Sequence, residues 1–396
     1  MNYISNKNLE LKGKKVLLRV DLNVPMKNGY VTESSRIEKI LPTINLLIEK
    51  QAKIVILSHI GRPKGKFVED MSLEPISRKL ASLINKKVLF NREKINEKTK
   101  SEINKIPNGS IMMLENIRFY EGEELNDNEF SSKLSDLGDI YVNDAFSCSH
   151  RSHASIEGIT KYMPSFFGLQ ITKEIDALKK LTSEIKKPIT LIIGGSKIST
   201  KINIINNLIK KFDNIIIVGG MANTMLKHTG KKIGKSIVED NCKNLIEEIL
   251  KNSKKYNCNI NCPVDVVVAK DIQSKGKNKS INEVDNDEMI LDIGPKTVSS
   301  IKQIVNESKT VLWNGPAGYF ENPSFQHGTK KILEIISKKT EIDKIFSVAG
   351  GGETVAAINK FKKLNSFTFV STAGGAFLEY LEGKTLPGIN ALNQNV

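Results

Sequence analysis

The chain has 396 residues, which is more than one hydrophobic core usually holds and suggests about two domains of 150–200 residues each. It is 39% apolar and 26% charged, has no apolar run of the ~18–20 residues that span a bilayer, no apolar signal core at its N-terminus and only four cysteines. We therefore expect a cytoplasmic protein without membrane contact, and the net charge of +15 (59 basic against 44 acidic residues) fits an anionic small molecule, a nucleic acid or merely a lysine-rich surface.

Short apolar runs rich in β-branched residues recur along the chain and predict strands. They cover residues 16–20, 54–58, 111–114, 140–142, 189–193, 215–218, 264–268, 289–293, 310–313, 345–348 and 367–370. Helix-length amphipathic segments, such as residues 34–51, lie between them. Apolar runs without alternation suit strands that are covered on both faces, and strand–helix alternation implies parallel βαβ units. We predict an α/β fold of two doubly wound parallel-sheet (Rossmann-like) domains, joined by a long helix, with a cleft between them.

The strands fall into two groups, separated by a long amphipathic segment that ends at Pro188. We expect an N-terminal domain over residues 1–168, a connector helix over 169–186 and a C-terminal domain over 187–382. The remaining residues, 383–396, are too few for a unit of their own, and we expect them to pack back near the hinge or on the N-terminal domain.

Polar side chains follow the strands of the first half. In open α/β sheets, ligands bind at the carboxyl ends of the strands, near the point where the strand order reverses. The residues at these positions are three arginines, three histidines, two carboxylates and two amides: Asp21, Asn23, His59, Arg62, Arg118, Asn143, Asp144, His150, Arg151 and His153. This edge of the first domain resembles a pocket for a small, multiply anionic molecule.

The arginines support an anionic ligand better than the total charge does. Only seven of the 59 basic residues are arginines, and all seven lie within the first 151 residues. A guanidinium grips a carboxylate or a phosphate with two parallel hydrogen bonds, which lysine cannot do. Arg19 lies inside a strand run and is expected to form a structural ion pair, whereas Arg78 and Arg92 are expected to be solvated.

Glycines follow the strands of the second half. They occur at 194–195, 219–220, 294, 315, 350–352 and 374–375, with Lys197 and Lys201 nearby. Glycine lets a ligand approach the backbone, and a glycine turn that leads into a helix aims free N–H groups at an anion. The second half therefore predicts a cradle for a polyphosphate nucleotide, which would react with the ligand of the first half across the cleft.

Generic motifs do not account for the sequence. The nearest approach to a P-loop, residues 230–236, is one residue too short between its glycines, and no G-x-G-x-x-G follows the first strand. The protein-kinase signatures H-R-D and D-F-G are missing. Cys258 and Cys262 have no second Cys/His pair close by in the sequence, which disfavours zinc. Trp313, at a strand end, suits a core position.

Eight segments in order, however, resemble the phosphoglycerate kinase family over essentially the whole chain. They are RVDLNVP (19–25), SHIGRP (58–63), LENIRF (114–119), NDAFSCSHRSHAS (143–155), GGSKISTK (194–201), WNGPAG (313–318), GGGET (350–354) and STAGGAFLEYLEGKTLPG (371–388). Each segment alone is a weak signal, but the ordered set makes a chance resemblance very improbable. The resemblance implies reversible phosphoryl transfer from 1,3-bisphosphoglycerate to MgADP, giving 3-phosphoglycerate and MgATP, by direct in-line transfer with domain closure.

The resemblance also implies roles for individual residues. Those matching the family's phosphoglycerate site are Asp21, Asn23, Arg36, His59, Arg62, Arg118 and Arg151. Those matching its ATP/ADP site are Lys197, Lys201, Asn314, Glu321, Gly351, Gly352, Glu353 and Thr354, with Gly195, Gly219 and Gly294 lining the adenosine pocket. The catalytic set would be Arg36, Lys197, Lys201, Gly352 and Gly375, and Glu353 would hold Mg²⁺. A monomer without a nucleic-acid partner is expected.

Two positions depart from the commonest family pattern. Glu353 stands where the family usually has Asp, which keeps the carboxylate but changes its reach. Ala373 stands where Gly is usual, which is compatible with an amide cradle if position 373 does not need a positive φ.

Rival classes make different predictions. A nucleic-acid-binding protein would bind DNA in a salt-dependent way, a dehydrogenase would bind NAD, and an inactive nucleotide-binding module would bind ATP without transfer. The sequence has no recognisable nucleic-acid-binding motif and no glycine fingerprint of a dehydrogenase. The retained arginines disfavour an inactive nucleotide-binding module.

Overall fold

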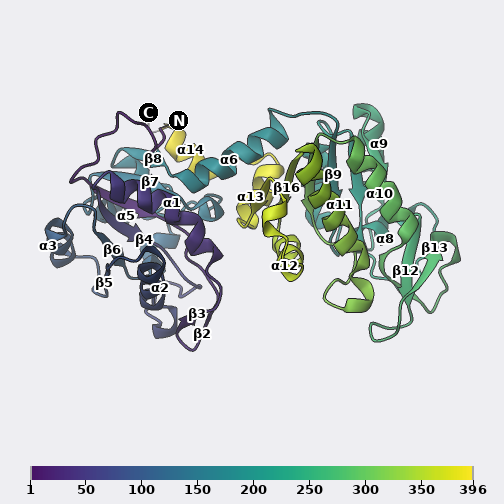
Figure 1. Cartoon of the computed structure of the whole chain (residues 1–396), viewed down its shortest axis with the longest axis horizontal. Helices are drawn as coiled ribbons and strands as arrows, with labels where there is room; N and C mark the ends of the chain where they lie inside the picture. The colour runs from purple at the N-terminus through teal and green to yellow at the C-terminus, as the bar shows by residue number, and fades with distance from the viewer. Residues whose placement is uncertain (1, 395–396) are drawn as a thin grey trace. The chain divides into compact units, whose positions relative to one another are not determined.

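The structure is a computed structural model that describes residues 2–394; residues 1, 395 and 396, which the domain prediction also covers, lie outside that range. The chain forms two compact units (Figure 1). The N-terminal unit extends to Asp176 and also includes the chain from Thr385 onward, and the C-terminal unit is Ala177–Lys384. The boundary lies within helix α6 (Leu169–Thr182), in the segment predicted as the connector.

The N-terminal unit is built on a six-stranded parallel sheet with the order β5-β6-β4-β1-β7-β8. Its strands are β1 (Lys15–Arg19), β4 (Lys53–Leu57), β5 (Val88–Asn91), β6 (Ile111–Leu114), β7 (Ile140–Asn143) and β8 (Ser165–Phe167), and a small hairpin pairs β2 (Met26–Lys27) with β3 (Tyr30–Val31). Its longer helices are α1 (Ser35–Glu49), α2 (Glu74–Ile84), α3 (Glu97–Lys105) and α5 (Asn128–Ser135), with a short turn α4 (Glu121–Glu124). The strand order reverses between β1 and β7.

Both faces of this sheet are buried. Val16 and Leu18 of β1 pack in one core with Ile37 and Ile44 of α1, whereas Leu17, which points to the opposite face, is also fully buried. The continuous apolar runs arise from this double coverage, as predicted.

The C-terminal unit repeats the design with the parallel order β11-β10-β9-β15-β16-β17. Its strands are β9 (Ile189–Ile193), β10 (Asn214–Ile217), β11 (Asn259–Asn261), β15 (Thr310–Asn314), β16 (Phe346–Gly350) and β17 (Phe369–Ser371). The helices are α7 (Ile202–Leu208), α8 (Gly219–His228), α9 (Lys243–Tyr256), α10 (Pro295–Glu307), α11 (His327–Asp343), α12 (Gly352–Lys360) and α13 (Gly375–Leu381). Trp313 is fully buried, as predicted.

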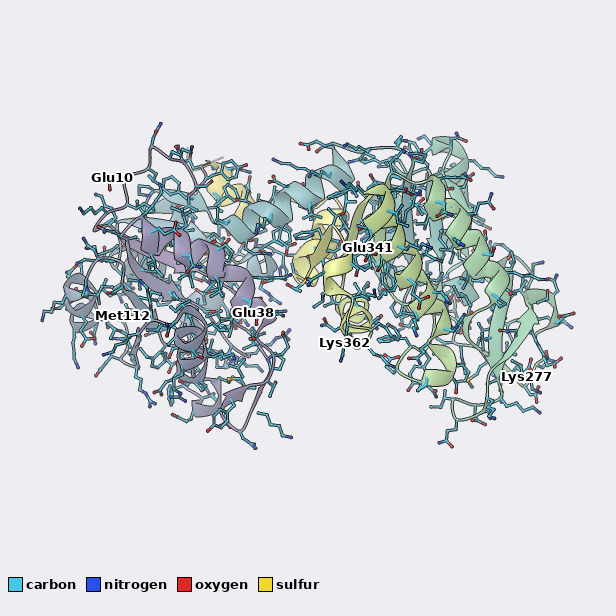
Figure 2. All side chains as sticks on the ribbon, in the orientation of Figure 1. Glu10, Glu38, Met112, Lys277, Glu341 and Lys362 are labelled. Atoms are coloured by element: carbon cyan, nitrogen blue, oxygen red, sulfur yellow. The ribbon has the colours of Figure 1, made fainter. Side chains whose placement is uncertain are left out.

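One sheet differs from the prediction. The runs at 264–268 and 289–293 form β12 (Asp265–Ala269) and β14 (Met289–Ile293), which pair antiparallel with each other, and β12 also pairs with β13 (Lys277–Ser280). An apolar run does not specify the direction of its partner. The strand β13 is polar, and its Lys277 extends outward in Figure 2. It therefore has no apolar run from which a strand could have been predicted.

The strands β5, β8 and β11, which we did not predict, are edge strands. They have only three or four residues each, so they carry little of the apolar pattern by which strands are predicted. At the other end of the chain, α14 (Pro387–Gln394) packs on the N-terminal unit, where Gly388 N donates to Ser149 O at 2.9 Å. Among residues 2–394, no helix is long and apolar enough to cross a membrane.

Candidate functional site

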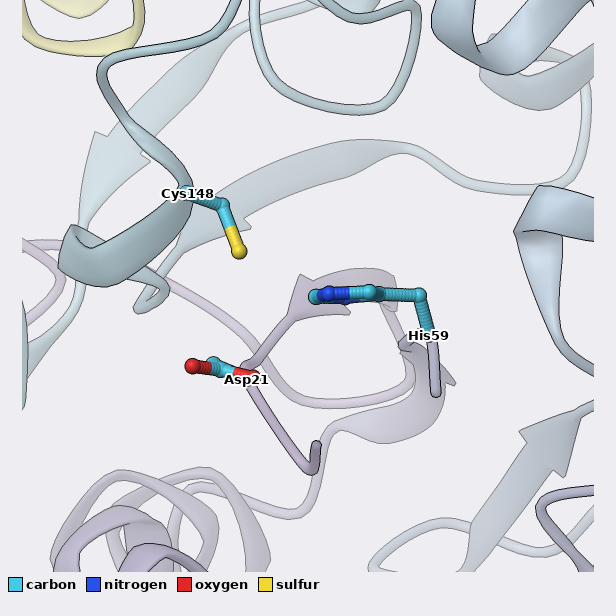
Figure 3. Close-up of side chains that lie close together, drawn as sticks. All are labelled: Asp21, His59 and Cys148. Atoms are coloured by element: carbon cyan, nitrogen blue, oxygen red, sulfur yellow. The ribbon is translucent and has the colours of Figure 1, made fainter. Parts of the chain in front are cut away.

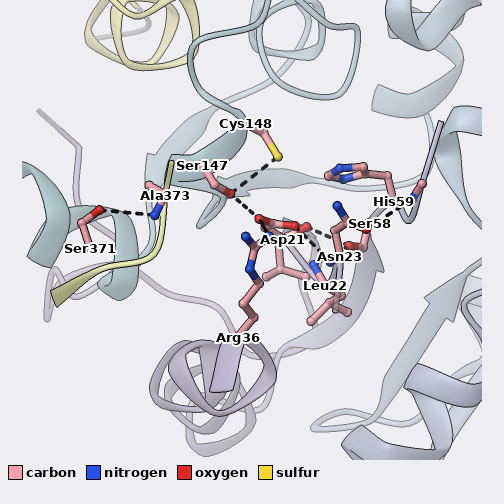
Figure 4. Close-up of polar contacts among 12 residues, drawn as sticks. Asp21, Leu22, Asn23, Arg36, Ser58, His59, Ser147, Cys148, Ser371 and Ala373 are labelled. Atoms are coloured by element: carbon pink, nitrogen blue, oxygen red, sulfur yellow. Dashed lines mark hydrogen bonds and ion pairs between the residues drawn. The ribbon is translucent and has the colours of Figure 1, made fainter. Parts of the chain in front are cut away.

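The first candidate site lies at the carboxyl ends of β1 and β7, where the strand order of the N-terminal sheet reverses. Asp21 is its hub (Figure 4). Its Oδ2 accepts a hydrogen bond from Arg36 NH1 at 2.5 Å and another, also short, from Ser147 Oγ. Its Oδ1 accepts from Asn23 N at 3.0 Å, so the carboxylate orients both the arginine and the loop after β1.

Asn23 and Arg118 meet at Gly61. Asn23 Oδ1 accepts from Gly61 N at 3.2 Å, and Arg118 NH1 donates to Gly61 O at 2.8 Å. Arg118 is 6% exposed, and its Nε lies 3.4 Å from Glu124 Oε1. The predicted residues of the loops after β1, β4 and β6 are therefore linked directly.

Arg62 and Arg151 have a different setting. Both are exposed, and neither side chain forms a hydrogen bond or ion pair with the described residues. Arg151 lies close enough to Arg118 and His153 for its charge to lower the pKa of both groups, after the larger effect of burial. The structure therefore connects Arg151 to the cluster electrostatically but brings Arg62 into no such contact.

His59 is 4% exposed and lies against Arg19. Burial lowers its pKa well below the ordinary range, and the charge of Arg19 lowers it further. Arg19 does not form the direct ion pair that we expected: within residues 2–394 no carboxylate lies within salt-bridge distance of it. Instead, Arg19 Nε donates to Ser155 Oγ at 2.9 Å, and Ser155 Oγ donates to Glu123 Oε1 at 2.7 Å.

Asp21, His59 and Cys148 converge so that ligand atoms of the three lie within 4.8 Å of one another (Figure 3). This is the spacing of a metal site, but the charges around it disfavour a cation. Arg19 NH2 lies 3.1 Å from His59 Nδ1 and 3.9 Å from Cys148 Sγ, and Arg36 is paired with Asp21. Guanidinium groups thus already contact all three of these side chains, and their positive charge would oppose a bound cation.

The second candidate site lies at the carboxyl ends of β9 and β15, where the C-terminal sheet reverses its order. Lys201 Nζ donates to Gly194 O at 2.5 Å, to Asn314 Oδ1 at 2.6 Å and to Asn314 O at 3.2 Å. Burial lowers the pKa of Lys201 to about 8, although Glu353 opposes the shift. The ammonium is held where the two central strands diverge.

The loops beside Lys201 are joined to one another by hydrogen bonds. Asn314 Nδ2 donates to Gly350 O at 2.8 Å, and Thr354 Oγ1 accepts from Gly315 N at 2.7 Å. Gly351 has a φ of 95°, and a Cβ there would lie 2.7 Å from Asn314 Nδ2. This position therefore requires glycine both for its backbone conformation and for space.

Gly352 and Gly375 begin helices α12 and α13, as predicted. A Cβ at Gly352 would meet no atom within 4 Å, so the approach to the first helix is open. The positive φ next to α13 belongs to Gly374, at 56°, and Ala373 does not have one. Ala373 N donates to Ser371 Oγ at 3.3 Å (Figure 4). The methyl group of Ala373 is thus compatible with this turn.

A pocket next to Lys201 is lined by Gly195 and Gly219, two of the three glycines predicted there, and by Glu321 and Glu353. Gly294 does not line it. Gly294 precedes α10, and a Cβ on it would collide with the carboxylate of Asp265, which explains the glycine structurally. Lys197 is exposed.

Sequence reasoning missed two polar residues. Ser147, which bonds to Asp21, sits in the quoted segment 143–155 but is of a type common in loops. Asp292 lines the pocket and accepts from Gly328 N at 2.7 Å at the start of α11. Burial raises the pKa of Asp292 to about 7. A carboxylate inside an otherwise apolar strand run was the available signal for Asp292.

The remaining singled-out side chains have local partners or are buried. Arg78 and Arg92 pair with Glu74 and stay more than half exposed, which fits the solvated positions predicted for them. Cys258 and Cys262 are free thiols whose pKa values burial raises to about 12, and they belong to no metal-like cluster among residues 2–394.

Comparison with known proteins agrees with this geometry. The family model described as Phosphoglycerate kinase matches residues 6–384. The phosphoglycerate kinase of Xanthobacter autotrophicus is 46% identical over 387 residues (97% of this chain, 98% of the relative), and that of Rhizobium meliloti is 44% identical over 387 residues (97% of each). The solved structure of phosphoglycerate kinase from Coxiella burnetii superposes with a TM-score of 0.91 at 39% identity (99% of each chain), and that from Pyrococcus horikoshii with 0.83 at 29% (100% and 99%). The chain therefore belongs to the phosphoglycerate kinase family.

Proposed function

We propose that the two sites carry out the reversible transfer of a phosphoryl group from 1,3-bisphosphoglycerate to MgADP, which gives 3-phosphoglycerate and MgATP in glycolysis and gluconeogenesis. Membership of the family makes the chain a phosphotransferase. The observation that carries the assignment to particular residues is that each parallel sheet has its own cationic or amide-rich site where its strand order reverses.

The N-terminal unit (residues 1–168 in the domain prediction) would bind the phosphoglycerate. Arg36 and Arg118 are already oriented by Asp21 and by Gly61, and the exposed Arg62 and Arg151 remain available to an incoming anion. Guanidinium groups fixed in this way would bind carboxylate and phosphate oxygens with little further loss of side-chain entropy.

The C-terminal unit (residues 187–382) would bind ATP or ADP, with the adenosine in the pocket beside Gly195 and Gly219 and the phosphates toward Lys201 and the start of α12. Glu353 fits the proposed Mg²⁺ ligand because it is an exposed carboxylate on the rim of that pocket, and Mg²⁺ prefers carboxylate and phosphate oxygens. Bound Mg²⁺ would neutralise charge on the nucleotide phosphates.

The proposed transfer needs no general base. The attacking group is an ADP phosphate oxygen or, in the reverse direction, a carboxylate, and both are ionised at neutral pH. The protein therefore has to align the reactants and stabilise the charge of the moving phosphoryl group. We assign this charge stabilisation to Arg36 and Lys201, with Lys197 in support, and to the amides at Gly352 and Gly375.

The test is a coupled assay of ATP formation from 1,3-bisphosphoglycerate and ADP with purified protein. We expect ATP to form only when Mg²⁺ and both substrates are present. Tight binding of ADP without any ATP formation would indicate an inactive nucleotide-binding module, and salt-sensitive binding of DNA without ATP formation would favour a nucleic-acid-binding protein.

The transfer requires the two ligands to meet, and we propose that the segment 169–186, with helix α6, acts as the hinge of this closure. Small-angle X-ray scattering should show a smaller radius of gyration when both substrates are added than with either alone. An identical profile in all three states would contradict the hinge.

We also propose a cytoplasmic monomer. Sedimentation analysis should give a mass near the 44.1 kDa of one chain at all concentrations. A mass that rises with concentration would refute the monomer.

A further inference from the structure

Arg19 is a fully buried arginine that the proposed transfer does not use. All three of its nitrogen atoms have partners: Nε donates to Ser155 Oγ, NH1 to the carbonyl oxygen of Val20, and NH2 lies 3.1 Å from His59 Nδ1. The guanidinium is therefore fixed in one orientation, with one edge against the imidazole ring.

This contact determines where the proton of His59 resides. A guanidinium has only N–H donors and does not lose its proton in proteins, so the atom that receives its hydrogen bond must have a lone pair. Nδ1 of His59 must then be unprotonated, and a neutral imidazole carries its single proton on the other nitrogen, Nε2. We infer that Arg19 is a positioning residue that fixes His59 as the neutral Nε2–H tautomer, so that His59 offers its ligand a hydrogen-bond donor.

The surroundings of His59 support a neutral ring. The charged and titratable groups that face it come from β1, α1 and the loops after β1, β6 and β7: Arg19, Asp21, Arg36, Arg118, Cys148 and His153. Three of the six are arginines, and burial together with their charge keeps the pKa of His59 well below its ordinary range. The one carboxylate among them, Asp21, is already paired with Arg36.

Arg19 is itself held by a bridged pair. Ser155 Oγ accepts from Arg19 and donates to Glu123 Oε1, while Ser155 N donates to Glu123 Oε2 at 2.9 Å. The fully buried Glu123 thus balances the charge of Arg19 without direct contact. A carboxylate placed directly beside the ring would have favoured the imidazolium form instead.

The consequence for binding rests on the proposed function, whereas the tautomer does not. An Nε2–H group can donate to an oxygen of 3-phosphoglycerate but cannot accept a proton at the same atom. His59 would then orient the substrate as a neutral donor and take no part in proton transfer, which agrees with a reaction that needs no base.

The direct test is ¹⁵N NMR of the whole protein labelled in its five histidines, with the His59 signals assigned from a His59→Gln variant. We expect one His59 nitrogen with the shift of a protonated ring nitrogen, coupled as Nε2, and one with the shift of a lone-pair nitrogen, unchanged from about pH 5 to pH 8. A signal from the Nδ1–H tautomer or from an imidazolium in this range would overturn the inference, whether or not the protein transfers phosphate.

Substitution of Arg19 tests the positioning role. In Arg19→Met, both His59 tautomers should be populated and the KM for 3-phosphoglycerate should rise about tenfold with the KM for ATP unchanged, because one oriented hydrogen bond to a charged ligand is lost. Arg19→Lys keeps an N–H donor, so its His59 tautomer population and its KM for 3-phosphoglycerate should lie between those of Arg19→Met and the unsubstituted protein. Arg78→Met, which removes an exposed arginine from the same unit, is the matched control and should change neither.

An unchanged tautomer in Arg19→Met would refute the inference. If that variant does not fold, Arg19→Lys and the spectrum of the unsubstituted protein still decide it. Should the proposed function alone be wrong, the Nε2–H spectrum would persist while no KM for 3-phosphoglycerate could be measured.

Discussion

The two candidate sites occupy equivalent places in two similar sheets but use different chemistry. The N-terminal site presents charged side chains, among them Arg36 and Arg118, each oriented by an acceptor of its own unit. The C-terminal site presents mainly backbone, in turns that contain Gly351 and Gly374, together with the half-buried ammonium of Lys201. The location of a binding site thus follows from sheet topology, whereas its ligand class follows from what the loops display.

The difference has a physical consequence. A guanidinium keeps its charge at every physiological pH, so the N-terminal site is a permanent cation. Lys201 has a pKa near 8, so its charge depends on pH. The C-terminal site therefore depends on backbone conformation and on the protonation of Lys201, whereas the arginines of the N-terminal site keep their charge over the same pH range.

The largest expected effect comes from Arg36. Arg36→Met should lower kcat on the order of 10³-fold, because the moving phosphoryl group loses a fixed cation, whereas the Kd for ATP should hardly change. Arg36→Lys keeps the charge but not the two parallel N–H donors of the guanidinium, so its kcat should lie between those of Arg36→Met and the unsubstituted protein. Steady-state kinetics and calorimetric titration of ATP measure the two quantities, with Arg78→Lys as the control. Equal losses in kcat and in ATP affinity would show that Arg36 is not specific to the transfer.

Gly351→Ala tests the backbone character of the other site. The methyl group would press on Asn314 Nδ2 and displace the start of α12, so kcat/KM for ATP should fall about 10²-fold. Gly230→Ala is the matched control because Gly230 also has a positive φ, 80°, but no atom within 4 Å of the added Cβ. The control should show the backbone strain in its thermal stability and leave the kinetics intact. Similar kinetic losses in both variants would attribute the effect to strain alone.

Lys201 predicts a pH dependence that the arginines cannot produce. The proposed role of Lys201 requires its protonated form, so kcat/KM for ATP should fall by half near pH 8 and about tenfold for each further pH unit. Glu353 raises the pKa of Lys201, so Glu353→Gln should move the midpoint to lower pH. A control substitution of the exposed Glu307, Glu307→Gln, should not move it.

Activity at high pH could be lost by deprotonation of Lys201 or by unfolding, and a measurement of stability distinguishes the two. The pKa of Lys201 is lower in the folded chain than its ordinary value of 10.5, so between about pH 8 and pH 10.5 the unfolded chain binds more protons. The contribution of Lys201 to the free energy of unfolding therefore increases with pH in the range where activity decreases. Loss of activity in parallel with loss of the folded state, followed by circular dichroism, would contradict the assignment.

The smallest effect is expected at Ala373. Since Ala373 does not have a positive φ, Ala373→Gly should leave kcat and both KM values within about twofold and should lower stability by ~0.5–1 kcal/mol through backbone entropy. Thermal melts and steady-state kinetics check this prediction. A large gain in activity would show that the methyl group of Ala373 obstructs the phosphate cradle.

The sequence was sufficient for the parallel sheets and for most of the residues at their carboxyl ends. Apolar runs covered on both faces identify central strands such as β1 and β9, and the loops that follow them carry Asp21 and Lys201. It was insufficient where the signal is not local. The edge strand β8, the polar strand β13 and the contact of Arg19 with His59 depend on partners far away in the chain. The need for glycine at position 294 likewise arises from a distant residue, Asp265, with whose carboxylate a Cβ would collide.

The hydrogen bond between Gly388 and Ser149 affects the order in which the protein can mature. Ser149 lies in the loop that carries Ser147, Cys148 and Arg151, and its carbonyl group is satisfied by a residue that the ribosome adds only after the whole C-terminal unit. Domains generally fold from the N-terminus as they emerge. Here the sheet of the N-terminal unit can assemble early, but the hydrogen bond to Ser149 forms only after Gly388 has been added, so the loop beside Asp21 gains this contact after the C-terminal unit has been synthesised.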